Sequence, residues 1–379
     1  MHVIALESYP SALRGGQELN LVDVCCGLSE RGHNISLLYV NEGNLLSKYQ
    51  EICDRIIKVD SFVLDRTTIS RSLNFFTDIW KIPVSQDSVV FTNRYHDVLF
   101  GSTLALTRKI PHVCFLQLPP LEKGFPRPLA TGLKGVKHFV AVSHQTKLDW
   151  VNSGTAKEKI DVVHGGVNLE RYKRASNFSS IRKEWNIPED TRVVSFVGRL
   201  DKEKGVETLI KAFALLQKNI ANTRLLIAGK PVNQGEEYNR SLVQLAVALG
   251  IEKLVDFLGH FTNTTSIYQV SDVSVLPSIW SEPFPRAIIE SMACGTPVIA
   301  SRIGGIPEFL TGKFHTHLFE PGDERDLANT LSQILTWRDT NPELGKKCHL
   351  YVQSNFTIEK MVDGVEKVLL KSVRDPKGL

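Results

Sequence analysis

The sequence predicts an α/β protein of two domains, each built on a parallel sheet that helices cover. Short apolar runs typical of buried strands alternate with helical patterns from residue 2 onward, and such alternation favours parallel sheets. A chain of 379 residues also exceeds the usual size of one domain. After a polar, irregular span at residues 173–190, a second alternating series begins at residue 192. We therefore expect domains at residues 1–172 and 173–379, with a ligand cleft between them.

Composition and charge exclude several classes of protein. Apolar residues make up 42% and charged residues 23% of the chain, as in an ordinary globular protein. The net charge of +4 comes from 45 bases and 41 acids and gives no indication of a nucleic-acid partner. No apolar run reaches transmembrane length, and residues 1–10 lack the features of a signal peptide. We expect a cytoplasmic chain whose six cysteines, without CxxC spacing, are buried free thiols.

The first domain contains a glycine pair at a position typical of anion binding. Gly15 and Gly16 precede an expected helix at residues 18–30, so their amides would approach a phosphate or sugar beside a helix N-terminus, although such pairs often form only a turn. The aromatic segment 61–80 is either a helix packed on the core or part of a binding pocket, and the Pro-rich loop 117–131 is of the kind that carries binding residues. The expected strands are residues 2–6, 35–40, 56–59, 88–92, 113–116, 138–142 and 160–163.

The second domain carries a charged, glycine-bounded turn directly after its first strand, Gly198-Arg-Leu-Asp-Lys-Glu-Lys-Gly205. Arg199 and Lys204 would suit a diphosphate, because Arg can fork onto phosphate oxygens and Lys supplies a compact charge. A solvated charged turn is the alternative. His260 and Phe261 follow a later strand and are placed to contact a base. The expected strands are residues 192–197, 224–228, 255–258, 272–276 and 297–300, and the expected helices are residues 206–216, 327–335 and 361–370.

The stretch at residues 278–310 carries two carboxylates, Glu282 on a loop and Glu290 on a helix expected to start near Pro285. If all residues between them were helical, the two would lie about 12 Å apart, which exceeds the separation of about 5–9.5 Å between the two carboxyls of a glycosidase. They suit two different parts of one long ligand with hydroxyls at both ends and an anionic middle, such as a sugar nucleotide. The alternative is that both are ordinary solvated acids.

The motifs GRLDKEKG, EPFPRAIIESMACGTPVIAS and GGIPE occur in that order, and together with the early glycine pair, AVSHQTK and VVHGGVN they resemble the family 4 glycosyltransferases over nearly the whole chain. The resemblance implies a GT-B fold of two Rossmann-like domains, the first binding the acceptor and the second the nucleotide sugar, with a last helix that crosses back to the first domain. It assigns Glu290 to the ribose hydroxyls and Glu282 to the transferred sugar. The remaining donor contacts that we expect are Gly15, Gly16, Arg199, Lys204, His260, Phe261, Phe284 and Arg286, and the catalytic set is Glu282, Arg199 and Lys204.

Two positions depart from the pattern of the family. Pro285 stands where many members have glycine, which removes one amide that could contact the donor sugar. Gln117 stands where many members have histidine, and glutamine can hydrogen-bond a hydroxyl but cannot titrate near neutral pH. His96 is a second candidate polar contact for the acceptor or sugar, with a structural histidine as the alternative.

The resemblance implies transfer of a sugar from a nucleotide diphosphate sugar to an acceptor hydroxyl, with retention at the anomeric carbon. We favour UDP-sugar over GDP-sugar. No DxD motif stands on a loop to hold a divalent ion, so we expect neither a metal nor a cofactor. The acceptor classes left open are a glycan, a lipid-linked sugar and a small natural product, and peripheral contact with the inner membrane face is also left open. The alternatives are a GT-B sugar-nucleotide epimerase and a catalytically silent sugar-nucleotide-binding subunit.

Overall fold

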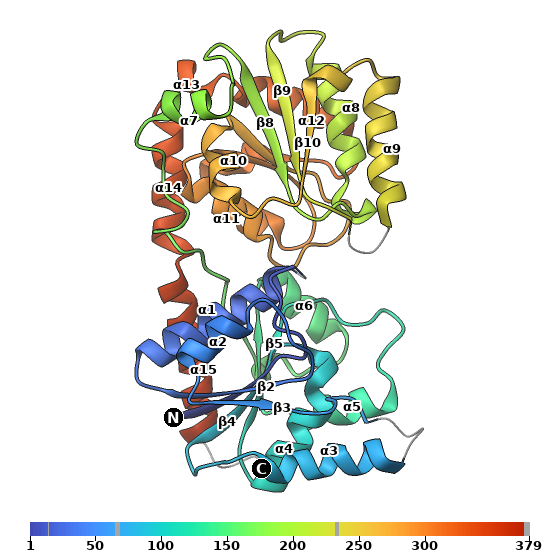
Figure 1. Cartoon of the computed structure of the whole chain (residues 1–379), viewed down its shortest axis with the longest axis vertical. Helices are drawn as coiled ribbons and strands as arrows, with labels where there is room; N and C mark the ends of the chain where they lie inside the picture. The colour runs from blue at the N-terminus through green and yellow to red at the C-terminus, as the bar shows by residue number, and fades with distance from the viewer. Residues whose placement is uncertain (14, 65–68, 232–234, 375–379) are drawn as a thin grey trace. The chain divides into compact units, whose positions relative to one another are not determined.

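The computed structural model describes residues 1–13, 15–64, 69–231 and 235–374. The chain forms two compact units, Met1–Gly166 together with Ile358–Leu379, and Val167–Thr357. Each unit contains one parallel sheet with helices packed on it (Figure 1), which confirms the predicted fold class. The unit bounds differ from the expected domains in two places, because the division falls at Val167 rather than after residue 172, and the last helix belongs to the first unit. Residue 14 of the glycine turn and residues 65–68 of the aromatic segment lie outside the described residues.

The first unit is built on a seven-stranded sheet of order β3-β2-β1-β4-β5-β6-β7. Its strands are apolar because helices cover both faces. The strands are β1 (His2–Leu6), β2 (Asn34–Tyr39), β3 (Arg55–Lys58), β4 (Ser88–Thr92), β5 (His112–Leu116), β6 (His138–Ala141) and β7 (Ile160–Val162). The helices are α1 (Gly16–Glu30), α2 (Leu46–Ile52), α3 (Ile69–Lys81), α4 (Val98–Arg108), α5 (Arg127–Lys134), α6 (His144–Asn152) and α15 (Ile358–Arg374), with 3₁₀ turns at Tyr95–Asp97 and Lys157–Lys159.

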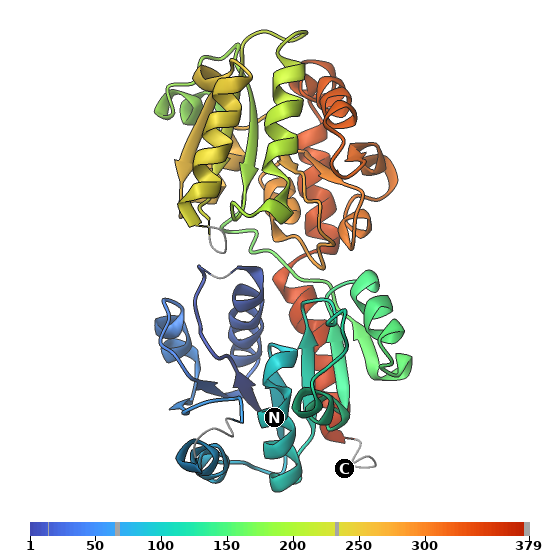
Figure 2. The same cartoon turned by 90° about the vertical axis from the view of Figure 1, so that its right-hand side faces the viewer.

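Helix α15 packs on α1, although nearly two hundred residues separate it from the rest of its unit in the chain (Figures 1 and 2). Gly27 allows the close approach, since a Cβ there would lie 2.5 Å from a methyl group of Val362. Arg31 forms ion pairs with Glu366 (2.5 Å) and with Asp363 (2.6 Å). The hydrogen bonds from Arg31 to the carboxylates of Glu366 and Asp363 raise the pKa of Arg31. These contacts fix the last helix against α1, in accord with the expectation that it returns to the first domain.

The second unit is built on a six-stranded parallel sheet of order β10-β9-β8-β11-β12-β13. Residues Ile306–Glu308 form a 3₁₀ turn. The strands are β8 (Arg192–Val197), β9 (Thr223–Ala228), β10 (Val255–Gly259), β11 (Val273–Leu276), β12 (Val298–Ser301) and β13 (Leu318–Phe319). The helices are α7 (Phe178–Glu184), α8 (Val206–Leu216), α9 (Gly235–Ala248), α10 (Thr264–Val270), α11 (Arg286–Ala293), α12 (Glu324–Ile334), α13 (Trp337–Thr340) and α14 (Leu344–Asn355), with further 3₁₀ turns at Lys202–Lys204, Glu252–Leu254 and Gly312–His317.

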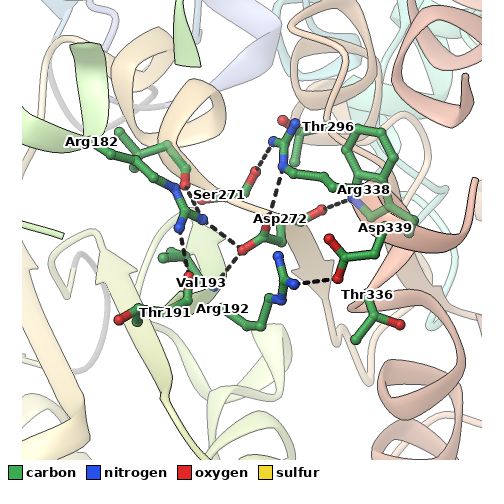
Figure 3. A network of polar contacts seen from close by, with 12 residues as sticks. Arg182, Thr191, Arg192, Val193, Ser271, Asp272, Thr296, Thr336, Arg338 and Asp339 are labelled. Atoms are coloured by element: carbon green, nitrogen blue, oxygen red, sulfur yellow. Dashed lines mark hydrogen bonds and ion pairs between the residues drawn. The ribbon is translucent and has the colours of Figure 1, made fainter. Parts of the chain in front are cut away.

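A buried ionic network ties α7, β8, β11 and α13 together (Figure 3). Asp272, which precedes β11 and is fully buried, accepts hydrogen bonds from Arg182 Nη2 (2.7 Å) and from the backbone N–H of Val193 (2.8 Å) on one oxygen. Its other carboxylate oxygen accepts from Arg338 Nε (2.8 Å). Both guanidinium groups lie near the ring of Phe178, that of Arg182 at 4.3 Å and that of Arg338 at 3.7 Å from the ring centre. The network is therefore an internal clamp at the amino ends of the central strands.

Among the described residues, the structure contains no helix with both the length and the apolar composition needed to cross a lipid bilayer.

Candidate functional site

Both predicted motifs of the second unit lie at the carboxyl edge of its sheet, on neighbouring strands. The turn at residues 198–205 follows β8, and the loop at residues 277–285 follows β11, which pairs with β8. From β8 the chain continues to β9 and β10 on one side, and later crosses to β11 on the other side. This reversal is a topological switch point, where parallel sheets open a crevice for ligands.

Two glycines hold these loops close together. Gly205 has φ 65°, and a Cβ there would lie 2.0 Å from the carbonyl oxygen of Pro277, so no other residue fits. The backbone N–H of Ile279 donates to the carbonyl of Glu203 (2.9 Å) across the same junction. Gly304 has φ 58°, and a Cβ there would lie 2.7 Å from the backbone of Glu282. The loop that carries Glu282 is thus fixed from both sides.

The structure brings Glu282 and Lys204 together. The Lys204 ammonium donates to Glu282 Oε1, and the hydroxyl of Ser278 donates to the same oxygen (2.7 Å). The side chains of Glu282 and Lys204 are 7% and 15% exposed, so this is a mostly buried pair. Arg199 lies on the same turn, forms an ion pair with Asp201 (3.0 Å) and remains 32% exposed. Two cations, each paired with a carboxylate, therefore occupy the edge of the sheet between β8 and β11.

Glu290 lies on α11 in a buried setting that the sequence did not indicate. Arg286 Nε, one helical turn away, lies 3.2 Å from Glu290 Oε1, and the hydroxyl of Tyr268 donates to Oε2 (3.4 Å). The ring of Tyr172 lies 6.4 Å from that of Tyr268. Burial and the negative charge of Glu290 raise the pKa values of both tyrosines. Tyr268 is on α10 and Tyr172 lies in the irregular span before α7, so only the tertiary fold reveals that both are near this carboxylate.

The aromatic candidates of the second unit are engaged in packing. Phe261 packs against Trp185, with ring centroids 5.5 Å apart, and Phe284 packs edge-on against Phe309 at 4.9 Å. His260 follows β10 and is exposed. Lys230, which the sequence analysis did not consider, is an exposed cation two residues after β9. Its carbonyl accepts from the N–H of Leu200 (3.1 Å), which ties it to the charged turn.

In the first unit, Gly15 and Gly16 lie at the start of α1, which begins two residues earlier than expected. Gly15 is the N-cap residue with φ 142°, a conformation that favours glycine, and Gly16 is the first helical residue. Gln117 follows β5 but does not present a free amide. Its Oε1 accepts from Asn20 (2.7 Å), and its Nε2 donates to Asn93 Oδ1 (2.5 Å). Its polar atoms are thus committed within the unit, in a network that sequence reasoning did not foresee.

His96 is half-buried in the 3₁₀ turn Tyr95–Asp97, and its ring stacks on that of Tyr95 with centroids 4.1 Å apart. The turn follows β4 and precedes α4, so His96 lies at the carboxyl edge of the first sheet. This stacking agrees with a structural role.

Two family models match the chain and together cover most of both units. The model described as "Glycosyltransferase Family 4" matches residues 14–171, and the model described as "Glycosyl transferases group 1" matches residues 177–351. The chain belongs to the family 4 glycosyltransferases. The order of the two matches along the chain agrees with the two sheets described above.

Curated relatives match this family member over only part of their length. It is 35% identical over 181 residues to D-inositol 3-phosphate glycosyltransferase of Mycolicibacterium smegmatis, covering 47% of this chain and 40% of that protein. It is 29% identical over 247 residues to N-acetyl-alpha-D-glucosaminyl L-malate synthase of Bacillus anthracis, covering 65% of this chain and 63% of that protein. The chain therefore spans less than two thirds of the length of these relatives.

Solved structures agree over the whole length of this glycosyltransferase family member. Alr3699/HepE of Anabaena, solved in complex with UDP, has a TM-score of 0.84 at 20% identity and covers 97% of this chain and 99% of that chain. A glycosyltransferase of Rickettsia africae ESF-5 has a TM-score of 0.82 at 18% identity and covers 99% of both chains. At such identities the likeness shows the fold alone, and the fold is GT-B.

Proposed function

We propose that the protein transfers a sugar from a UDP-sugar to an acceptor hydroxyl with retention at the anomeric carbon. The observation that carries the proposal is the meeting of Glu282, Lys204 and Arg199 at the switch point between β8 and β11, followed by the buried Glu290 on α11. This arrangement offers cations for a diphosphate and carboxylates for hydroxyl groups on either side of it. UDP is favoured over GDP because Alr3699/HepE, a structural neighbour across the whole chain, was solved with UDP.

Each residue then has a defined role. Glu290, held by Arg286 and Tyr268, accepts hydrogen bonds from the ribose hydroxyls. Arg199 and Lys204 neutralise the diphosphate, and Glu282 contacts the transferred sugar while it orients Lys204. In the first unit, the amides of the Gly15–Gly16 turn at the N-terminus of α1 form an anion- and sugar-binding element.

The proposed reaction places little demand on a titrating base. The acceptor oxygen attacks the anomeric carbon on the face that the nucleotide leaves, the bond from that carbon to the phosphate oxygen breaks, and the acceptor proton moves to the departing diphosphate. The chief requirement is stabilisation of the charge that develops on the diphosphate. Lys204 and Arg199 supply positive charge at that point. Gln117 cannot take the proton near neutral pH, and this mechanism does not ask it to.

We expect calorimetry of the full chain to show UDP binding that Mg²⁺ does not change and that GDP does not match. Glu290→Ala should weaken UDP binding about 10- to 100-fold, because hydrogen bonds from hydroxyls to a buried carboxylate are lost. Glu343→Ala, at an exposed position on the same unit, is the matched control and should bind UDP normally. Absence of UDP binding, or binding that requires a metal, would contradict the proposed donor site.

Helix α3 carries an exposed apolar stripe that suits contact with a membrane surface, and such contact would bring a lipid-linked acceptor within reach. Phe75 faces the core, whereas Leu73, Phe76 and Trp80 are 59%, 49% and 66% exposed. The guanidinium group of Arg108 lies 5.4 Å from the centre of the Trp80 ring, which places a cation beside the stripe. Aromatic side chains next to basic ones suit the interface of an anionic bilayer. We propose peripheral contact with such a surface through this stripe.

We expect the wild-type chain to sediment with vesicles of anionic phospholipid, and the double variant Phe76→Ser, Trp80→Ser to lose most of this binding. Leu148→Ser removes an equally exposed apolar side chain on α6 and should leave the binding unchanged. Equal sedimentation of all three proteins, or none by the wild type, would refute the membrane contact.

A further inference from the structure

A directional chain of hydrogen bonds ends at Glu7 in the first unit. Glu7 directly follows β1, is fully buried, and accepts from Asn93 Nδ2 (2.5 Å) and from the backbone N–H of Tyr9 (3.3 Å). Asn93, after β4, accepts from Gln117, which follows β5 and accepts from Asn20 on α1. Glu7 is therefore the terminal acceptor of a network across the carboxyl ends of three adjacent strands.

The same network holds the first turn of α1. The carbonyl of Gln17, the second residue of the helix, accepts from the side-chain amides of both Asn93 and Gln117, each at 3.3 Å. Gln17 directly follows the Gly15–Gly16 turn. The acceptor at Glu7 fixes the orientation of the side-chain amides of Asn93 and Gln117. If one amide were flipped, two donors or two acceptors would face each other in the hydrogen-bond network. The geometry of the glycine turn is thus coupled to Glu7.

The groups around Glu7 make its negative form unfavourable. The carboxylates of Glu18 on α1 and of Asp97 in the 3₁₀ turn after β4 lie near it, as do Cys25 on α1 and Tyr49 on α2, which stay uncharged at neutral pH because burial raises the pKa of both. Arg94, nearby in sequence to Asn93, donates to the hydroxyl of Ser8 (3.0 Å). Burial and the charge of Glu18 raise the pKa of Glu7 to about 8, against the hydrogen bond from Asn93. The carboxyl is therefore mainly neutral at neutral pH.

We propose that Glu7 is a positioning residue that holds the Gly15–Gly16 turn for catalysis through Asn93 and Gln117, and that its neutral carboxyl is the competent form. The inference rests on the proposed transferase function. Ionisation of Glu7 places a second negative charge beside Glu18 in a fully buried setting. Movement of the first turn of α1 away from Glu7 relieves this repulsion, and it displaces the adjoining glycine turn.

The first test is the pH profile of Glu7→Gln, which mimics the neutral carboxyl. We expect the wild type to lose kcat as the pH rises through about 8, whereas Glu7→Gln keeps the wild-type kcat at neutral pH and lacks this alkaline loss. Glu42→Gln, exposed on the same unit, should retain the wild-type profile. An alkaline loss that persists in Glu7→Gln, or a variant that folds but is inactive at every pH, would overturn the proposal.

Two further measurements separate this proposal from the proposed function. Because the pKa of Glu7 rises from 4.5 to about 8 on folding, the folded chain binds an extra proton between these pH values. The free energy of unfolding of the wild type should therefore fall relative to that of Glu7→Gln as the pH rises from 4.5 to about 8.

The second measurement is hydrogen exchange of the backbone amides in the first turn of α1. Above about pH 8 this exchange should become faster in the wild type only, by more than the intrinsic exchange rate itself increases with pH. Equal protection in both proteins would overturn the role of Glu7, whereas absent turnover with this difference intact would refute only the proposed function.

Discussion

Asp272→Ala should lower the free energy of unfolding of the second unit by about 3–5 kcal/mol, the cost typical of breaking a buried ion pair from one side. Asp272 is fully buried and Arg182 is 1% exposed, so removal of the carboxylate leaves a guanidinium group without its counter-charge in the interior. Arg338 loses its carboxylate partner at the same time, as does the N–H of Val193 (Figure 3). The expected loss is therefore the penalty of uncompensated charge rather than that of one hydrogen bond.

The measurement for Asp272→Ala is urea unfolding followed by a probe of the second unit, because two units need not unfold in one transition. Glu320→Ala is the matched control. Glu320 pairs with Arg302 at 3.0 Å, but the two side chains are 63% and 38% exposed, so this loss should cost less than about 1 kcal/mol. Similar unfolding midpoints for the two variants would show that the clamp around Asp272 does not stabilise the unit.

The sequence predicted the sheets well because their strands are parallel and buried. Residues 2–6 and 192–197 are short apolar runs without polar alternation, as expected of strands covered on both faces, and the structure has strands there. The family resemblance grouped Glu282 with Arg199 and Lys204, but the strand order that brings the charged turn after β8 beside the loop of Glu282 after β11 was not predicted from the sequence. Helix α11 begins at Arg286, directly after the expected Pro285.

Side-chain partnerships could not be predicted in the same way. Gln117 was expected to face a ligand, but its partners Asn20 and Asn93 lie 97 and 24 residues away in the chain. No local pattern marks Glu7, because a glutamate after a strand is usually a loop residue and only burial makes it unusual. The pairing of Lys204 with Glu282 likewise spans 78 residues. Such contacts depend on the conformations of the loops at the carboxyl edge of the sheet. The hydrophobic periodicity of the sequence predicts helices and strands but not these loop conformations.

Lys204→Ala should lower kcat for sugar transfer by about 10²–10³-fold, the effect typical of removing one preorganised group that stabilises developing charge. Lys204 is 15% exposed and fixed by Glu282, so the ammonium is already oriented when the diphosphate binds. Lys202→Ala is the matched control, since Lys202 lies in the same 3₁₀ turn but is exposed, and it should retain wild-type kcat. Equal turnover of the two variants would remove Lys204 from the mechanism.

A double variant separates the loss of charge from damage to the site. Lys204→Ala leaves the carboxylate of Glu282 buried with Ser278 as its remaining described side-chain partner, so some stability should also be lost. In Lys204→Ala, Glu282→Gln the uncompensated charge is gone, and the thermal unfolding midpoint should recover toward the wild-type value. Turnover should not recover, because the cation for the diphosphate is still missing and the carboxylate proposed to contact the transferred sugar is also gone. If turnover returned together with stability, Lys204 would act by neutralising Glu282 alone, and the stabilisation of the diphosphate would have to come from Arg199.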